Sequence, residues 1–364
     1  MLFKKLGLVA LASAAAVVMI SSFPALKEGQ FLSAKSGSAE VEQAFIQFIA
    51  KYGRSYASKH ELPERFKKFQ KNYEMIMAHN SKSDVSFRMG VNQFADRFDH
   101  EMPQASVQVD EETMTFHDSK KLLKASLQQA VAQNVDWRTT GKVSPVQDQG
   151  TCGACWAFSG TDCVSSAFAI EKGYSIANGD TSKTISIQHH VDCDTNNNGC
   201  NGGNQDRLYA FIKSSGYFQT QDYYYSNYIM MKGNCMASSS AAKKKYRSDL
   251  NPYAIRVISA TNLKYAVQYQ PVGAVINVPT CVQYYASGVL TESSCPCAFK
   301  DATGKPIFTH AVTIIGYATT TSIRGCSGYY IVKNSYGPYW GENGYMRVCI
   351  PLDVDTDQNG TCNI

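Results

Sequence analysis

Two cysteines stand three residues apart near the middle of the chain, in the stretch QGTCGACWAFSG that runs from Gln149 to Gly160. The spacing of Cys152 and Cys155 fits a redox dithiol, half of a zinc site, or a single nucleophilic thiol beside a disulfide. Each of these chemistries needs different partners elsewhere in the chain, so the surrounding sequence decides between them.

The first two chemistries do not find their partners. A thiol oxidoreductase motif opens a helix within a βαβ unit, and the sequence contains no pattern of that kind. A zinc site needs a second ligand pair in register, and Cys295 and Cys297 have the wrong spacing. We therefore expect no metal and no other cofactor.

A nucleophilic thiol at Cys155 agrees with its local sequence. The stretch CWAFSGTDCVSSAFAI places Phe158, Cys163 and Ala167 near one face of a helix that begins at Cys155. Free N–H groups and the helix dipole favour a negative group at that position. We therefore expect a lowered pKa for Cys155 and a reactive thiolate.

A thiolate nucleophile needs a base, and His189, His190 and His310 are the histidines beyond residue 131. The stretches HAVTIIGY and GYYIVKN are rich in β-branched and aromatic residues, which predicts strands. His310 opens the first, and Asn334 ends the second before the turn-forming Ser-Tyr-Gly-Pro. A helix from one half and strands from the other can bring Cys155 and His310 together.

Two helical patterns precede this region. The first is EVEQAFIQFIAKYG, and the second is ELPERFKKFQKNYEMIMAHN, residues 61–80. The second holds residues at steps of three and four, which places them on one helix face: Glu61, Arg65, Phe69, Asn72, Ile76 and Asn80. We expect Glu61 and Arg65 to pair and Pro63 to lie in the first turn. Periodicity alone indicates an amphipathic helix in a bundle.

Composition limits the remaining classes. The chain has 364 residues, 44% apolar and 18% charged, with a net charge of +5, which predicts a packed core. Its dense basic run, residues 243–245, is not part of a basic and aromatic stripe, so we expect no nucleic-acid binding. A short basic start and an apolar run predict a secretory signal peptide over residues 1–25, with an uncleaved anchor as the alternative. All twelve cysteines lie beyond residue 150, and secretion favours disulfides.

Several blocks together resemble the papain family of cysteine proteases. The six residues on the face of the second helix match the ERFNIN pattern of cathepsin-L-like propeptides, and Gly90 to Asp96 resembles their G-x-N-x-F-x-D element. The stretch around Cys155 has the papain-type signature. Blocks in the family's order follow: DCDTNNNGCNGG, THAVTIIGY and YYIVKNSYGPYWGENGYMRV. The resemblance spans about residues 41–362.

The resemblance implies an α+β, papain-like two-lobed fold, with a helical left lobe and an antiparallel β-barrel-like right lobe, preceded by a helical propeptide. It implies an inhibitory propeptide over residues 41–100, a linker over 101–130 and a peptidase domain over 131–364. The family pattern pairs Cys152 with Cys200, Cys193 with Cys235, and Cys295 or Cys297 with Cys362. Five cysteines then stay unassigned; of these, Cys163 and Cys349 are expected to be inert buried thiols.

The resemblance also assigns roles in a catalytic site. Cys155 is the nucleophile, His310 its base and ion-pair partner, Asn334 the residue that orients the imidazole, and Gln149 an oxyanion donor. Substrate-binding residues are then expected from the same blocks and from an apolar wall: Gly202, Gly203, Thr309, Tyr336, Val275 and Ala311. Tyr336 stands where relatives have tryptophan; we expect it to stack and to support activity, at a reduced level.

The expected function is that of a cysteine endopeptidase, made as a zymogen, that forms an acyl-enzyme intermediate. A non-catalytic peptide-binding homologue is the alternative. An exopeptidase is disfavoured because His189-His190 is in the wrong place for the His-His loop of cathepsin-B-like enzymes. The expected partners are peptide and protein substrates, the chain's own propeptide and cystatin-like inhibitors, and the expected state is a monomer. The expected location is the secretory pathway, with the lysosome, the vacuole or the outside of the cell as destination.

Overall fold

The computed structural model describes residues 38–58, 60–103, 107, 131–223, 231–237, 245–246, 260–352 and 360–364. The chain divides into two compact units. The first holds the described residues up to Met75 together with Ala95–Arg97, and the second holds Ile76–Phe94 and Phe98–Ile364. The predicted signal peptide lies outside the described residues. Of the linker predicted over residues 101–130, the structure describes residues 101–103 and Val107.

The first unit is built on two helices, α2 (Ser38–Tyr52) and the part of α3 (Glu61–Asn80) that ends at Met75. Both predicted helices are confirmed. Phe45 and Phe48 of α2 each meet Phe69 of α3 with ring centroids 5.1 Å apart. Aromatic burial of this kind supplies the apolar core that two helices need in order to pack.

The polar residues on the same face of α3 hold the backbone of the segment that follows. Arg65 forms the predicted ion pair with Glu61, at 2.9 Å, and also donates to the carbonyl oxygen of Asp96 at 3.1 Å. Asn72 is buried and donates to the carbonyl oxygen of Ala95 at 2.8 Å. These contacts explain why polar residues occur at helical spacing beside buried aromatic ones.

The second unit contains a seven-stranded sheet with the order β1-β6-β9-β8-β7-β2, in which β5 also pairs with β7. Neighbouring strands are antiparallel except β6 and β9, which are parallel. The described strands are β1 (Phe87–Met89), β2 (Asn134–Asp136), β5 (Val272–Ile276), β6 (Tyr285–Leu290), β7 (His310–Ala318), β8 (Cys326–Lys333) and β9 (Tyr345–Pro351), with a separate pair β3 (Tyr217–Phe218) and β4 (Lys245–Tyr246).

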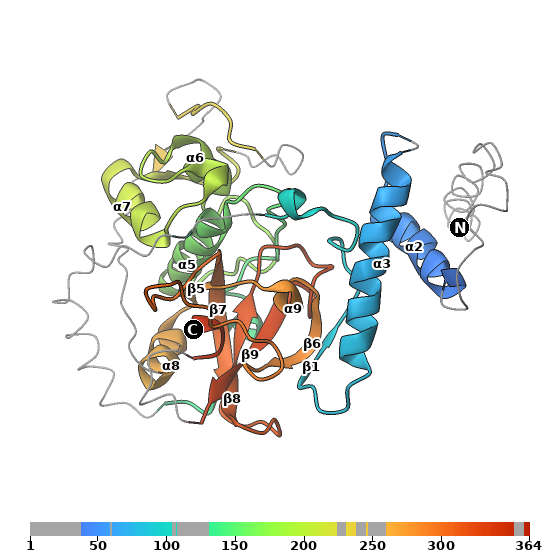
Figure 1. The fold of residues 1–364 in the computed structure, drawn as a ribbon. Helices are drawn as coiled ribbons and strands as arrows, with labels where there is room; N and C mark the ends of the chain where they lie inside the picture. Colours follow the sequence, from blue (N-terminus) through green and yellow to red (C-terminus); the bar gives the residue numbers. More distant parts are fainter. Residues whose placement is uncertain are drawn as a thin grey trace, which may run out of the picture. The chain divides into compact units, whose positions relative to one another are not determined.

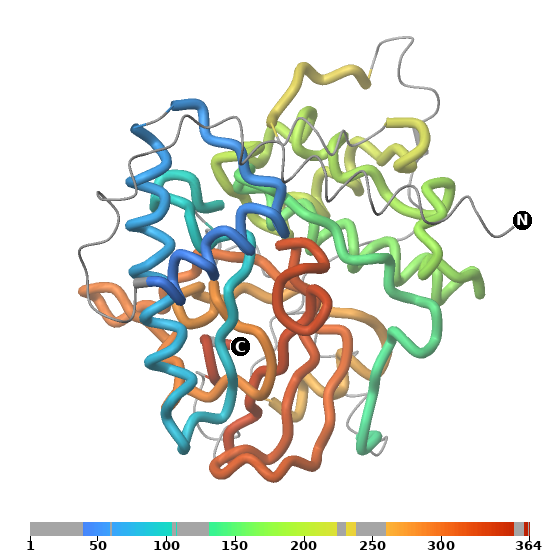
Figure 2. Tube along the Cα trace, turned by 90° about the vertical axis from the view of Figure 1, so that its right-hand side faces the viewer, coloured from blue at the N-terminus to red at the C-terminus, as the bar shows by residue number. Residues whose placement is uncertain are grey.

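The second unit also contains helices, which together with the sheet confirm the α+β class. They are α5 (Cys155–Glu171), α6 (Ile187–Cys193), α7 (Gln205–Ser215), α8 (Ala260–Tyr269) and α9 (Thr280–Gln283), with short 3-10 turns η1 (Asp99–Glu101), η3 (Trp137–Thr140), η4 (Gly199–Asn201) and η5 (Thr361–Asn363). Helix α5 packs on α6 and α7 and against β7. The green segments that contain α5, α6 and α7 lie to one side of the orange-to-red strands (Figures 1 and 2), whereas α8 and α9 lie beside those strands. Among the described residues, no helix is both long and apolar enough to cross a membrane.

The register of β7 places the predicted site residues. Ile276 pairs with His310 and Val275 with Ala311 across β5 and β7. Strand β8 ends at Lys333, one residue before Asn334, at which the sequence predicts its end. Because α5 packs against β7, the first residue of α5 and the first residue of β7 come from elements that share one interface.

Strand β1 comes from the segment that precedes the catalytic region, and it pairs antiparallel with β6. Phe87 lies opposite Gly288, whose φ is 101°. A Cβ at Gly288 would come within 2.6 Å of the Phe87 backbone, so only glycine allows this close approach. The approach lets β1 join the sheet as an additional edge strand.

Five disulfides staple the second unit. Two predicted pairs are confirmed, Cys152–Cys200 and Cys193–Cys235, and Cys362 pairs with Cys297 rather than Cys295. The other bridges are Cys281–Cys295 and Cys326–Cys349. Cys163 is a free buried thiol as expected. The same expectation for Cys349 is wrong, because β9 and β8 are neighbours and bring it to Cys326.

Candidate active site

Cys155 is the first residue of α5 and is fully buried. It forms a small apolar cluster with Ala311 of β7 and with Val107, which comes from the segment before the catalytic region. Val275 and Phe308 pack against the same cluster. The structure therefore brings three predicted site residues together, Cys155, Ala311 and Val275, with a residue of the N-terminal segment covering them.

The ionisation of Cys155 differs from the sequence-based expectation. Burial raises the pKa of the Cys155 thiol to about 11, although hydrogen bonds with the backbone of Ala311, Trp156 and Cys155 itself lower it. Desolvation of a fully buried thiolate raises the pKa by more than the hydrogen bonds to backbone N–H groups at the helix start lower it. In this covered state Cys155 is a neutral thiol.

His310 and Asn334 meet as predicted. The His310 Nε2 and the Asn334 Oδ1 are 2.7 Å apart, and both residues are buried. Since an amide oxygen only accepts, Nε2 carries the proton and Nδ1 is left as the acceptor nitrogen of the neutral ring. Burial lowers the pKa of His310 to about 4, against a smaller opposite effect of the Asn334 hydrogen bond. Burial thus favours the neutral form of the imidazole as it does that of the thiol.

Tyr336 covers the imidazole. Its ring stacks on His310 with centroids 4.7 Å apart, and the edge of Trp340 meets it at 5.6 Å. The stacking expected from the sequence is confirmed, and the smaller ring still lies over the histidine. With this ring stacked on it, His310 is 2% exposed.

Gln149 is fully buried, and its side chain is fixed at both ends. Its Nε2 donates to the Cys152 carbonyl oxygen at 2.8 Å, and its Oε1 accepts from the Ser335 hydroxyl at 2.5 Å. One N–H of the amide is thus used by the loop, and the oxyanion role expected of Gln149 would fall to the second N–H and stays a prediction.

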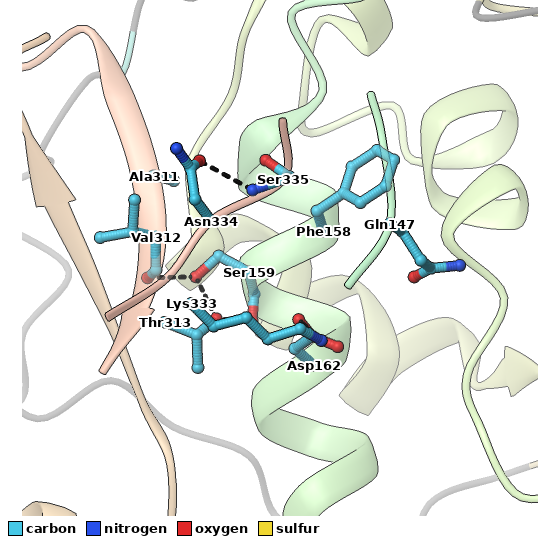
Figure 3. Close-up of a pocket in the computed structure, with 10 residues that line it drawn as sticks. All are labelled: Gln147, Phe158, Ser159, Asp162, Ala311, Val312, Thr313, Lys333, Asn334 and Ser335. Atoms are coloured by element: carbon cyan, nitrogen blue, oxygen red, sulfur yellow. Dashed lines mark hydrogen bonds and ion pairs between the residues drawn. The ribbon is translucent and has the colours of Figure 1, made fainter. Parts of the chain in front are cut away.

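Ser335 is a residue that sequence reasoning missed. Its backbone N–H donates to Asn334 Oδ1 at 2.7 Å while its hydroxyl holds Gln149. It therefore ties Gln149, the expected oxyanion donor, to Asn334, the expected orienting residue. Figure 3 shows Asn334 and Ser335 beside α5. Its place in the sequence, between the predicted site residues Asn334 and Tyr336, was the feature that could have indicated it.

The loop before α5 is held by the neighbouring block. The Cys152–Cys200 disulfide joins the two segments, Gly153 N–H donates to the Cys200 carbonyl oxygen at 2.8 Å, and the Trp156 indole N–H donates to the Gly199 carbonyl oxygen at 3.0 Å. The loop is thereby fixed relative to the start of α5, which is what an oxyanion site requires.

Gly202 and Gly203 end this neighbouring block, and local packing requires both to be glycine. Gly202 has a φ of 108°, a conformation that side chains rarely adopt. A Cβ at Gly203 would come within 2.5 Å of the Asn197 amide oxygen and 2.8 Å of the Trp156 ring. Their glycine identity therefore has a structural cause that is independent of any substrate.

Thr309 is engaged with the end of β5. Its hydroxyl donates to Asn277 Oδ1 at 3.0 Å and accepts from the Val278 N–H at 3.0 Å. It anchors the start of β7 next to His310. The structure does not bring its hydroxyl into the Cys155 cluster, so its expected substrate role stays a prediction.

A second part of the N-terminal segment contacts the site within the same unit. Phe94 is buried and meets the Tyr336 ring edge-on, with centroids 5.1 Å apart. Gln93 donates to the Tyr336 carbonyl oxygen, and Asn92 donates to the Gln283 carbonyl oxygen at 2.8 Å. Polar and aromatic contacts thus hold the stretch 92–94 against the aromatic cover of His310.

The site combines a buried thiol at a helix start with a histidine that has an asparagine partner, and a preceding segment lies against them. This arrangement is that of a thiol hydrolase with a covering pro-segment. Comparison with protein families agrees. Residues 131–364 match the papain family cysteine protease model, and residues 45–102 match the cathepsin propeptide inhibitor domain. The chain belongs to the papain family and is a cysteine protease that carries its propeptide.

Known proteins of the same kind are similar along most of the chain. A senescence-specific cysteine protease of Arabidopsis thaliana is 34% identical over 89% of this chain and 88% of its own length. The solved structure of a recombinant stem bromelain precursor covers 89% of this chain and 96% of its own, with a TM-score of 0.70 and 30% identity. A procathepsin L 3 of Tenebrio molitor larval midgut aligns with a TM-score of 0.67 and 27% identity, over 89% of this chain and 96% of its own.

Proposed function

We propose that this chain is the zymogen of an endopeptidase that cleaves peptide bonds with Cys155 as nucleophile and His310 as base. The observation that carries the proposal is the 2.7 Å contact of His310 with Asn334, in a chain where the next residue, Ala311, packs on Cys155. The Nδ1 of His310 is then the nitrogen that exchanges a proton with the thiol.

In the acylation step the Cys155 thiolate attacks the carbonyl carbon of the scissile peptide bond. The negative charge moves to the carbonyl oxygen, where the free N–H of Gln149 and the Cys155 backbone N–H stabilise it. As the C–N bond breaks, His310 gives its proton to the leaving amine. The products of the step are a free amine and a thioester on Cys155.

In the deacylation step the neutral His310 takes a proton from water, and the resulting hydroxide attacks the thioester carbonyl. The C–S bond breaks, the acid product leaves, and the sulfur departs as a thiolate beside the imidazolium. Asn334 accepts from Nε2 throughout, which keeps Nδ1 directed at the reacting atoms.

We propose in addition that the propeptide holds the site inactive. Val107 packs on Cys155 and Ala311, and Phe94 packs on Tyr336. Excluding water keeps both the thiol and the imidazole neutral, so removal of the propeptide restores water and permits the thiolate–imidazolium pair.

The proposal is tested with Cys155→Ala and a matched control, Cys163→Ala, because Cys163 is the other free cysteine and lies buried on the same helix. Each full-length chain is acidified and assayed with a fluorogenic peptide, with and without an epoxide inhibitor of cysteine proteases. We expect inhibitor-sensitive cleavage in wild type and Cys163→Ala and none in Cys155→Ala. Equal cleavage by Cys155→Ala would refute Cys155 as the nucleophile, and no cleavage by wild type would favour a non-catalytic peptide binder.

The five disulfides support synthesis in the secretory pathway, since such bridges persist in oxidising compartments. We propose a lysosomal, vacuolar or extracellular destination, peptide and protein substrates, and a monomeric enzyme open to cystatin-like inhibitors. Fractionation of cells expressing the tagged chain, with size-exclusion chromatography of the mature form, tests these assignments.

A further inference from the structure

A buried ion pair lies behind the proposed active site, between α5 and the end of β8. The Lys333 ammonium is 2.7 Å from Asp162 Oδ2 and donates to the Ser144 hydroxyl at 2.8 Å. The Ser144 hydroxyl donates in turn to Asp162 Oδ1 at 2.7 Å. The three side chains form a closed ring of charge-assisted hydrogen bonds.

Each member of the ring stands close in sequence to one proposed catalytic residue. Lys333 immediately precedes Asn334, and Ser144 lies in the loop that leads to Gln149. Asp162 lies seven residues after Cys155 on α5, which places the two near one helix face. The ring therefore joins the three segments that deliver Cys155, Asn334 and Gln149, and Figure 3 shows Asp162, Lys333 and Asn334 around one narrow cavity.

The ring is buried at Lys333 and borders a hollow at Asp162. The Lys333 side chain is 2% exposed and that of Asp162 17%. With Ser144, Asp162 also lines a hollow of about 140 Å³ that is rich in serine and threonine. The hollow gives the carboxylate access to solvent, whereas Lys333 depends on its two partners.

Stability alone is a weak reason for such a pair. Buried ion pairs are costly to desolvate, and apolar residues of similar volume replace them without loss of stability in other proteins. A lysine at the end of a strand, held by a carboxylate from a helix and a hydroxyl from a loop, instead fixes the distance between three separate segments.

We propose that the Lys333–Asp162 pair, closed by Ser144, is a positioning device that fixes Asn334, and through it the imidazole of His310, relative to the helix that carries Cys155. This inference rests on the proposed function of His310 and Asn334. Without the pair, the end of β8 loses its tether to α5. The side-chain oxygen of Asn334 then no longer holds the Nε2 of His310 in a fixed position. Proton exchange between His310 and Cys155 becomes less efficient.

The test compares wild type, Asp162→Asn, Ser144→Ala and the control Glu342→Gln, which breaks another ion pair, Arg347–Glu342, on β9. The propeptide of each full-length chain is cut away with added pepsin, and alkylation of Cys155 by iodoacetamide is followed by mass spectrometry from pH 4 to 10. We expect Asp162→Asn to move thiolate formation to higher pH and to lower kcat by about 10- to 100-fold with KM unchanged. Ser144→Ala has a smaller effect in the same direction, and Glu342→Gln leaves the profile unchanged.

A double variant, Asp162→Leu with Lys333→Met, separates positioning from stability because no charge stays buried. We expect it to fold and melt near the wild-type temperature while its alkylation profile stays shifted. A wild-type profile and kcat in the double variant, or in a folded Asp162→Asn, overturns the inference. Because alkylation needs no peptide cleavage, the alkylation profile, unlike kcat, is independent of the Cys155→Ala assay that decides the proposed function.

Discussion

The phenol ring of Tyr336 lies on the imidazole of His310, with centroids 4.7 Å apart and planes inclined by 28°. The resemblance to papain-family proteases implies a tryptophan at this position. The contact shows that the smaller tyrosine ring also stacks on the histidine. It covers the ring that the 2.7 Å hydrogen bond to Asn334 orients.

Removing the Tyr336 ring is expected to lower kcat by about tenfold or more, because His310 loses the surface that limits its movement and its contact with water. Tyr336→Ala tests this loss, and Tyr336→Phe keeps the ring and serves as the matched control. Tyr336→Trp is expected to equal or exceed wild type in peptide turnover. A lower turnover in Tyr336→Trp would count against tyrosine being an undersized cover.

Gln149→Ala is expected to lower kcat by about 10²- to 10³-fold with little change in KM, as for other side-chain oxyanion donors. Ser335→Ala keeps the Gln149 side-chain amide but removes the hydroxyl that donates to its Oε1, so we expect a smaller loss of kcat. Steady-state kinetics of the mature variants measures both. Equal kcat for wild type and Gln149→Ala would remove this residue from the oxyanion site.

Phe94→Ala is expected to weaken the hold of the propeptide on the site, because the Phe94 ring is 1% exposed and packs on Tyr336. Truncating a buried phenylalanine costs about 3 kcal/mol, or about 100-fold in binding. The measurement is the rate at which an epoxide probe labels Cys155 in the unprocessed chain at neutral pH. Ile46→Ala, at an exposed position, is the control, and equal labelling in both variants would contradict the role of Phe94.

His190 makes the stability of the chain depend on pH. It is buried in α6, where its Nδ1 lies 2.8 Å from the Ser186 carbonyl oxygen, and burial lowers its pKa from 6.5 to about 4. The unfolded chain therefore binds the proton more tightly. The free energy of unfolding is fully present above pH 6.5 and falls as the pH drops toward 4, by up to about 3 kcal/mol.

His190→Leu is expected to lose this dependence. Denaturant unfolding of full-length Cys155→Ala, with and without His190→Leu, is compared at pH 7.5 and pH 4.5. The variant should gain stability relative to its parent on acidification, whereas His60→Leu, at an exposed position, should not. Parallel losses in both backgrounds would show that His190 does not carry the effect.

The cluster of Val275 and Ala311 around Cys155, which Val107 occupies in this state, predicts a preference for a hydrophobic residue two positions before the cleaved bond. A positional-scanning peptide library measures it on the mature enzyme. A preference for charged residues at that position would be inconsistent with this apolar wall. Val275→Glu should shift acceptance toward basic residues.

Elements with strong local signals could be predicted from the sequence. The helix over residues 61–80 has the bounds that its periodicity predicts, and the ion pair of Glu61 with Arg65 follows from their spacing. His310 and Asn334 lie at strand ends as expected. Period and turn chemistry are local properties, so a single sequence contains them.

Features that depend on distant segments could not be predicted in the same way. The pairing of Cys349 with Cys326 requires the order of β8 and β9. The raised pKa of Cys155 follows from its burial, in a cluster that includes the distant residues Val107 and Ala311. Lys333 and Asp162 are 171 residues apart, and neither is unusual within its own element. The Ser335 hydroxyl likewise bonds to Gln149, which is distant in the sequence.

The pairing of β1 with β6 has a consequence for the enzyme after maturation. Loss of the N-terminal segment removes β1 and leaves the backbone donors and acceptors of β6 without their strand partner, which turns an interior strand of the sheet into an edge. Until that moment the propeptide shields the sheet from edge-to-edge association with other chains. Maturation thus opens a strand-sized docking edge as well as a catalytic site, and β9 keeps β6 in place from its other side.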